Sequence, residues 1–99
     1  MIITTWNIRG FNNKGKQRYL KERLKRDKPN IMLIQETKLR ENKLKEVMSN
    51  LKPHYEVIGQ DATGSAGRVA ILWNLEEVQF EDWTSIPRIL SSRFRILCS

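Results

Sequence analysis

The sequence predicts a mixed α/β fold that begins with a β-α-β unit and continues with antiparallel strands. Two segments rich in β-branched and apolar residues, at 2–6 and 31–34, have the composition of strands. The segment between them, at 16–27, has the spacing of an amphipathic helix. Strands joined in this way lie parallel with a right-handed crossover, so the first three elements form one unit.

The predicted helix at 16–27 places Leu20 and Leu24 on one face and basic residues around the rest. It should end at Lys28, because a residue that precedes proline is disfavoured in the helical region. The apolar run at 31–34 is continuous and bounded by helix-breaking residues, which predicts a strand buried on both faces.

A second helix is predicted at 41–51, where apolar side chains recur at i, i+3, i+4 and i+7. We interpret this stripe as core packing rather than as a cofactor or partner site. Beyond it we expect a strand at 55–59, a small-residue loop at 61–67 and a central strand at 69–73. Two further strands complete an antiparallel meander; they are expected at 78–84 and 93–98.

The length of 99 residues indicates one domain at most, and the hydrophobic fraction of 39% is ordinary for a globular protein. No apolar run approaches the roughly 20 residues that span a bilayer, so we expect no membrane association. The N-terminus lacks the basic region and apolar stretch of a secretory signal. The single cysteine, Cys98, excludes an intramolecular disulfide and is expected to be a buried strand residue rather than a reactive thiol. Together these features favour an intracellular protein, with the nucleus as one location.

The net charge of +7 is unevenly distributed along the chain. Residues 1–50 carry 13 Lys and Arg against 5 Asp and Glu, a net +8, and residues 51–99 carry 5 against 6, a net −1. The excess is densest between Lys14 and Lys28. A one-sided basic surface is typical of a polyanion binder. The alternative is an ordinary solvated helix face.

Two polar residues follow the predicted parallel strands at their carboxyl ends: the amide Asn7 and the carboxylate Glu36. Ligands of open α/β sheets gather beyond these strand ends, and both side chains offer oxygen atoms suited to a divalent cation. Each also has a structural interpretation. Glu36 could cap the next helix or pair with Lys38, and Asn7 could bond the backbone of the turn at 9–10. Only Asn7 and Glu36 taken together favour a ligand-binding site over these structural interpretations.

Three motifs, in this order and strand context, resemble the endonuclease/exonuclease/phosphatase superfamily. The similarity is greatest to the endonuclease domain of non-LTR (LINE-type) retrotransposons of plants. It covers nearly the whole chain. The motifs are Thr5-Trp6-Asn7-Ile8-Arg9-Gly10, Gln35-Glu36-Thr37-Lys38-Leu39 and Gly64-Ser65-Ala66-Gly67-Arg68-Val69-Ala70-Ile71-Leu72-Trp73-Asn74.

The resemblance implies a four-layer α/β sandwich, two mixed sheets with helices outside, of which this chain supplies the N-terminal half. It also implies phosphoester hydrolysis with Mg²⁺ or Mn²⁺. Glu36 matches the metal-binding glutamate, and Asn7 matches the active-site asparagine that orients metal and phosphate. Mg²⁺ prefers such hard oxygen ligands and often uses only one or two protein carboxylates.

The departures from the family are severe. Its domains are roughly twice this length, so we expect residues 1–99 to be a partial domain truncated on the C-terminal side. The later tyrosine, the Asp-x-Asn motif, a further aspartate and the Ser-Asp-His motif have no counterparts here. His54 lies too early in the chain to act as the missing histidine and is interpreted as a surface turn residue. Arg68 stands where relatives usually have glycine; it perturbs the entry to the strand, lies on the surface or contacts phosphate.

These observations leave three hypotheses. The first is a piece of a Mg²⁺-dependent endonuclease-like domain, inactive alone, whose uncovered sheet face invites a missing C-terminal half or self-association. The second is a non-catalytic module that binds DNA or RNA through basic residues. The third is a transposon remnant without function. The candidate nucleic-acid-binding residues are Arg9, Lys16, Arg18, Lys21, Arg23, Lys25 and Arg26.

Overall fold

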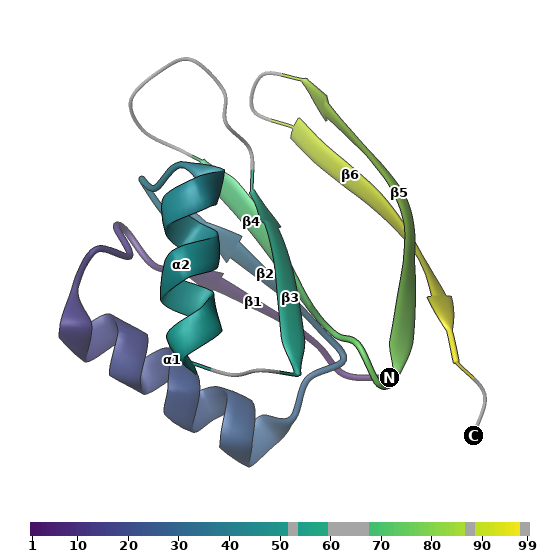
Figure 1. Cartoon of the computed structure of the whole chain (residues 1–99), viewed down its shortest axis with the longest axis horizontal. Coiled ribbons are helices and arrows are strands. Elements are labelled where there is room, and N and C mark those ends of the chain that lie inside the picture. Colours follow the sequence, from purple (N-terminus) through teal and green to yellow (C-terminus); the bar gives the residue numbers. More distant parts are fainter. Residues whose placement is uncertain (52–53, 60–67, 87–88, 98–99) are drawn as a thin grey trace.

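The chain forms two helices, a four-stranded sheet and a two-stranded hairpin, arranged in layers (Figure 1). The computed structural model describes residues 1–51, 54–59, 68–86 and 89–97, with only the backbone described at 51, 84–86 and 89–91. The helices cover one face of the larger sheet, and the hairpin stands on the other side (Figure 1). The elements are β1 (Ile3–Asn7), α1 (Lys14–Asp27), β2 (Ile31–Gln35), α2 (Glu41–Leu51), β3 (Tyr55–Gly59), β4 (Val69–Asn74), β5 (Val78–Ile86) and β6 (Ile89–Ile96).

The larger sheet has the strand order β1-β2-β4-β3. β1 and β2 are parallel, in a register that places Asn7 beside Gln35. β4 runs antiparallel to both β2 and β3, so the predicted central position of the 69–73 segment is confirmed. The carboxyl ends of β1, β2 and β3 therefore meet the start of β4 at one edge of the sheet, which we call the site edge.

Helix α1 begins at Lys14, two residues earlier than predicted, because the Asn13 side chain caps it. The Asn13 carboxamide oxygen accepts from the Lys16 backbone N–H at 3.0 Å, which satisfies one of the free donors of the first turn. The helix ends as predicted before Pro29, where Lys28 adopts a left-handed conformation (φ 45°). Leu20 and Leu24 are fully buried, which confirms the predicted apolar face.

The space between the helices and the sheet is filled by apolar side chains from both. Leu44, Val47 and Met48 of α2 are buried there, so the predicted stripe is core packing. Phe11, in the loop before α1, is fully buried in the same cluster. From the sheet come Ile34 and Leu72, among others.

The last two strands, β5 and β6, are antiparallel to each other, as predicted, and they form a separate two-stranded sheet. Trp73 explains this arrangement: its indole stacks on Phe80 at 4.9 Å between ring centroids and contacts Phe94 at 5.4 Å. Turning the hairpin onto the sheet buries these rings in a second core. The pattern is that of a fold with sheets of mixed orientation, as expected. Cys98 lies outside the described residues.

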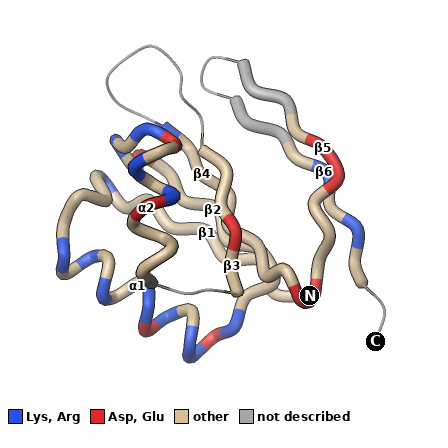
Figure 2. Tube along the Cα trace, in the orientation of Figure 1, with Lys and Arg blue, Asp and Glu red and all other residues tan. Residues whose placement is uncertain are grey.

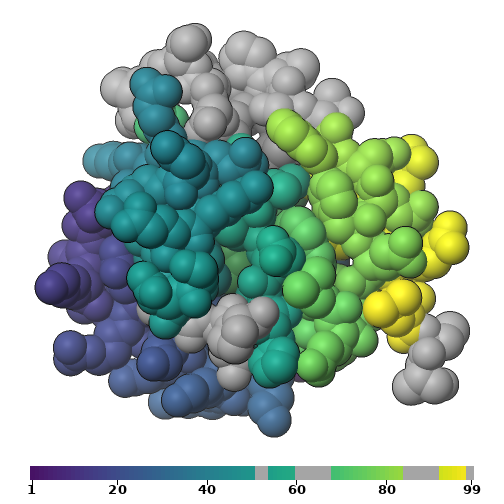
Figure 3. Space-filling model, in the orientation of Figure 1, coloured from purple at the N-terminus to yellow at the C-terminus, as the bar shows by residue number. Residues whose placement is uncertain are grey.

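The hairpin leaves the β1 side of the sheet face uncovered. Ile3 is 57% exposed and Ile2 is 50% exposed, whereas Ile31 and Ile71, nearer the hairpin, are buried. Space filling shows α1 and the loop before it on one flank of the molecule and the hairpin on the other (Figure 3). No described helix is long and apolar enough to cross a membrane.

Candidate functional site at the sheet edge

The structure brings Asn7 and Glu36 together at the site edge. Asn7 is the last residue of β1 and is in register with Gln35, the last residue of β2. Glu36 follows Gln35 in the chain, so it lies next to Asn7 at the ends of the two parallel strands, as the β-α-β unit predicts. Arg68 joins them, since it directly precedes β4 and its carbonyl accepts from the Thr37 N–H at 3.0 Å.

A short ladder of backbone hydrogen bonds ties the loop after β1 to the loop after β2. The Ile8 N–H donates to the Gln35 carbonyl at 3.0 Å, and the Gly10 N–H donates to the Glu36 carbonyl at 2.7 Å. The Phe11 N–H continues the ladder to the Thr37 carbonyl at 2.9 Å. Because Phe11 is also anchored in the core, these loops have a defined position relative to the sheet.

Positive backbone φ angles are concentrated in these two loops. Arg9 has φ 52°, Glu36 has φ 57°, Lys38 has φ 58° and Gly10 has φ 101°. A side-chain-bearing residue in this region is strained, and such strain persists where the surroundings impose it, often at functional sites. The hydrogen-bond ladder imposes it here.

The structural interpretations of Glu36 and Asn7 are wrong. Among the described residues, the half-buried Glu36 carboxylate has no hydrogen-bond or ion-pair partner, and it neither pairs with Lys38 nor caps α2. Within the same ranges the exposed Asn7 amide makes no hydrogen bond, and the Gly10 N–H that it could have bound donates to the Glu36 backbone carbonyl. Within the described ranges, both polar groups are therefore available to a ligand.

Arg68 leaves the strand entry undisturbed. Gln35 pairs with Val69 and Ile34 with Ala70, so the β2–β4 register continues to the first residue of β4. The Arg68 side chain is half-buried beside this edge. The β2–β4 pairing is therefore regular from Val69 onward, directly after Arg68.

Two residues at the edge were not singled out as site residues from the sequence. Thr37 is buried, and its hydroxyl accepts from the Leu39 N–H at 3.3 Å, which shapes the loop after Glu36. Lys38 is exposed, and its Cδ lies 3.7 Å from where a Cβ on Gly10 would stand. Their only signal in the sequence was membership of the Glu36 motif.

The candidate nucleic-acid-binding residues fall into separate groups (Figure 2). Arg9 lies in the loop at the site edge and is exposed. The Lys16 ammonium donates to the carbonyls of Ile8 at 2.7 Å and Arg9 at 3.2 Å, so it braces that loop. Arg23 pairs with Asp27 at 2.6 Å. The remaining members are exposed along α1, away from Glu36; they are Arg18, Lys21, Lys25 and Arg26.

His54 lies at the opposite edge of the sheet, directly before β3, in the turn predicted for it. Its Nδ1 lies 3.2 Å from a Glu76 carboxylate oxygen, and both side chains are largely exposed. It therefore contributes nothing at the site edge.

The donors at the site edge fit a hard cation only in part. Glu36 offers a carboxylate and Asn7 an amide oxygen, the ligand types that Mg²⁺ and Mn²⁺ accept. A second carboxylate of this edge, on Glu41, instead accepts from the Gly59 N–H at 3.0 Å. No group of three or more His, Cys, Asp or Glu side chains gathers among the described residues. A cation here would need water or substrate oxygens for most of its coordination.

The comparisons with known proteins agree with this fold. The model of the Endonuclease/Exonuclease/phosphatase family matches residues 4–96. An AP endonuclease from Archaeoglobus fulgidus has 24% sequence identity and a TM-score of 0.69, with 93% of this chain and 37% of that chain covered. Humanized D. rerio TDP2 has 17% identity and a TM-score of 0.69, covering 95% and 44%.

A third solved structure is the 3′ phosphatase NExo from Neisseria, bound to a product DNA hairpin. It has 23% identity and a TM-score of 0.58, with 80% of this chain and 30% of that chain covered. The chain thus spans less than half the length of these three structures. At these identities the similarity shows a shared fold. Among curated proteins, no match is found.

Proposed function

The chain belongs to the Endonuclease/Exonuclease/phosphatase family, and from this premise we propose that its site edge is one side of a metal-dependent phosphodiesterase site. Glu36 is the metal ligand, with Mg²⁺ or Mn²⁺ as the cation. Asn7 orients the phosphate and the neighbouring side chains. The observation that carries this proposal is the juxtaposition, beyond the ends of two parallel strands, of two polar groups that have no partner in the part of the chain that the structure describes.

The backbone strain at Glu36 supports the assignment. A left-handed glutamate is costly, and glycine or asparagine would serve better if only the turn mattered. Glu36 thus occupies a position whose left-handed backbone conformation does not by itself favour a glutamate. Functional groups held at a cost in stability are typical of active sites.

A bound divalent cation would supply charge stabilisation for the phosphate and leaving oxygen. What this chain supplies is the carboxylate that holds the cation and the Asn7 amide that positions a phosphate oxygen. The described part of the site edge contains no histidine or second available carboxylate to activate water. We therefore propose that the chain alone binds metal weakly and does not turn over substrate, because loss of members of a catalytic unit costs orders of magnitude in rate.

The test separates binding from turnover. Mn²⁺ added to the ¹⁵N-labelled chain should broaden the amide signals of Ile8, Glu36 and Thr37 first. Glu36→Gln should abolish this effect, and Glu22→Gln, which removes an exposed carboxylate of α1, should preserve it. Equal broadening in both variants would remove Glu36 as the ligand. Plasmid and abasic-site DNA should remain intact with Mg²⁺, and robust nicking would contradict the proposed inactivity.

A second candidate function is nucleic-acid binding without catalysis, favoured by the exposed cations of α1. Nonspecific binding of this kind weakens with salt, with a log–log slope of about −0.9 for each phosphate neutralised. Replacing both Lys21 and Lys25 by Gln should lower the slope by about 2 units if both contact phosphates. DNA retardation that is unchanged in this variant would exclude the outer face of α1 as the binding surface.

Within this family, we also propose a specific lineage for the chain. The motifs around Asn7 and Glu36 support a LINE-type retrotransposon lineage and an intracellular, nuclear protein. Sequencing of the flanking genomic DNA tests the lineage. A reverse-transcriptase frame nearby would support it, and an unrelated conserved gene context would oppose it.

A further inference from the structure

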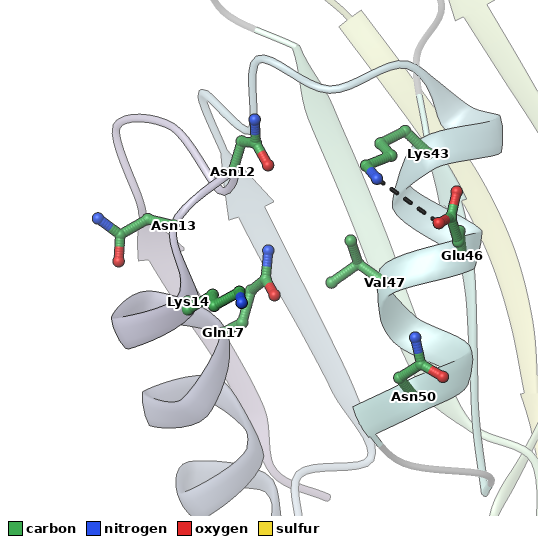
Figure 4. A pocket seen from close by; sticks show the side chains of 8 residues that line it. All are labelled: Asn12, Asn13, Lys14, Gln17, Lys43, Glu46, Val47 and Asn50. Atoms are coloured by element: carbon green, nitrogen blue, oxygen red, sulfur yellow. Dashed lines mark ion pairs between the residues drawn. The ribbon is translucent and has the colours of Figure 1, made fainter.

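A cleft of about 390 Å³ lies between the start of α1 and the middle of α2 (Figure 4). One wall comes from the loop before α1 and its first turn, and the other from α2. Asn12 and Gln17 face Lys43, Val47 and Asn50 across the gap, whereas Asn13 points away to cap its helix (Figure 4). The remaining lining residues are Lys14 and Glu46.

The cleft combines three chemical features. Its α2 wall contributes the apolar side chain of Val47, which is 9% exposed. Its walls carry carboxamides: the Gln17 Nε2 donates to the Phe11 carbonyl at 3.0 Å, which leaves its oxygen free to accept. Neither Asn12 nor Asn50 has a side-chain partner within the described part of the chain, so each offers a donor and an acceptor.

Positive charge lies at the mouth of the cleft. Lys14 is exposed and has no carboxylate partner among the described residues. Lys43 lies 3.6 Å from Glu46, an exposed pair that contributes little and can rearrange around a ligand. An apolar side chain, carboxamide walls and lysines at the mouth match a planar heterocycle joined to a phosphate. Side-chain amides form paired hydrogen bonds to base edges, and adenine suits them best.

The cleft also adjoins the site edge through one loop. Asn12 follows Phe11, whose N–H binds the Thr37 carbonyl next to Glu36. Asn12 is five residues from Asn7 in sequence, which limits their Cα separation to at most about 18 Å. A short single strand with a phosphate at the site edge can therefore reach the cleft.

We propose that this cleft binds one nucleotide of a single-stranded nucleic acid, with its base against Val47 and its edge paired with Asn50 and Asn12. Lys14 and Lys43 contact its phosphate. The inference rests on the proposed function for the choice of ligand, but it concerns separate residues. It adds a base-reading subsite to an edge that otherwise contacts only phosphate.

The test uses the Glu36→Gln chain, so that metal binding at the site edge plays no part. A 5′-phosphorylated hexamer of deoxyadenylate is titrated into the ¹⁵N-labelled protein. The side-chain NH₂ signals of Asn12, Gln17 and Asn50 should shift and saturate together. A hexamer of abasic deoxyribose phosphate should bind about fivefold or more weakly, since it lacks the base edge.

Matched variants locate the effect. Asn50→Asp and Lys43→Gln should weaken binding by about fivefold or more. Lys45→Gln removes an exposed cation from the same helix outside the cleft and should have a much smaller effect. All three positions are exposed, so the variants should fold, and circular dichroism checks this.

Three outcomes overturn the inference. Equal binding of the two hexamers would show that no base is read. Equal effects of Lys43→Gln and Lys45→Gln would show that only net charge matters. Shifts confined to the backbone amides of Ile8 and Thr37, beside the Glu36→Gln substitution, would place the strand at the site edge alone. That result would refute the cleft and leave the proposed function intact. Conversely, shifts in the cleft with no Mn²⁺ effect in the unmodified chain would refute the proposed function alone.

Discussion

The Gly10 N–H donates to the Glu36 carbonyl at 2.7 Å, and this bond joins the two loops that form the site edge. Both residues have positive φ, 101° for Gly10 and 57° for Glu36. The geometry of the proposed metal ligand thus depends on a glycine 26 positions earlier in the chain. This dependence makes the loop pair testable by substitution.

Gly10→Ala should lower the free energy of unfolding by about 1–3 kcal/mol, because alanine is strained at this φ. The cause is the backbone and not a clash, since the nearest atom to the new methyl group is Lys38 Cδ at 3.7 Å. Urea denaturation measures the loss. Adding Lys38→Ala should leave the loss unchanged, whereas a rescue by Lys38→Ala would show that side-chain crowding was responsible.

Glu36→Gly should leave stability unchanged or raise it by up to about 1 kcal/mol, since relief of left-handed strain offsets the greater chain entropy of glycine. The same change should abolish Mn²⁺-induced broadening. Glu36→Val should instead destabilise the chain by about 1–3 kcal/mol, because β-branched residues are poorly tolerated there. Thermal melts of the two variants give the comparison. A glycine variant less stable than the valine variant would contradict the strain argument.

Trp73→Ala should destabilise the protein by about 3–5 kcal/mol, since it removes the ring that packs against both Phe80 and Phe94. Hydrogen exchange should accelerate in β5 and β6 more than in β1 and β2, because the hairpin contacts the sheet through this cluster. Trp73→Phe serves as the control and should keep most of the protection. Uniform acceleration across both sheets would show that the hairpin does not dock as a separate unit.

We expect the protein to lose stability at alkaline pH because the hydroxyl of Tyr55 is buried. Burial raises the pKa of its hydroxyl above the ordinary value of 10.0, and the nearby Glu77 carboxylate adds to the shift, while a hydrogen bond with Asn74 opposes it. The unfolded chain therefore releases this proton first. The stabilisation is fully present below pH 10 and is lost as the pH rises from there through the folded-state pKa.

Tyr55→Phe isolates this effect from lysine titration. The variant should be less stable near neutral pH by about 0.5–1.5 kcal/mol, because the Tyr55 hydroxyl no longer donates to the Pro29 carbonyl, a bond of 2.7 Å. The gap between the two proteins should narrow above pH 10, as urea melts at a series of pH values can measure. A constant gap would show that the hydroxyl does not titrate differently in the two states.

The elements of this fold follow from local patterns in the sequence. Leu20 and Leu24 lie one helical turn apart and are both buried, and the run before Gln35 is a strand buried on both faces, as its continuous apolar composition predicts. Asn13 shows the limit of such patterns. Helix α1 begins two residues earlier than the apolar spacing predicts. The reason is the hydrogen bond from the Lys16 N–H to the Asn13 side chain, which caps the helix at that earlier point.

The sequence by itself determined the β-α-β order, the buried helix faces and the meeting of Asn7 and Glu36 at one edge, since all of these depend on near-neighbour spacing and on the handedness of the crossover. Only the tertiary structure decided that β5 and β6 leave the sheet, that Glu36 adopts a left-handed backbone and that its carboxylate has no partner within the described residues. Those outcomes depend on contacts between residues far apart in the chain. The Trp73 ring holds the hairpin against the sheet, and the Gly10 N–H holds the backbone of Glu36.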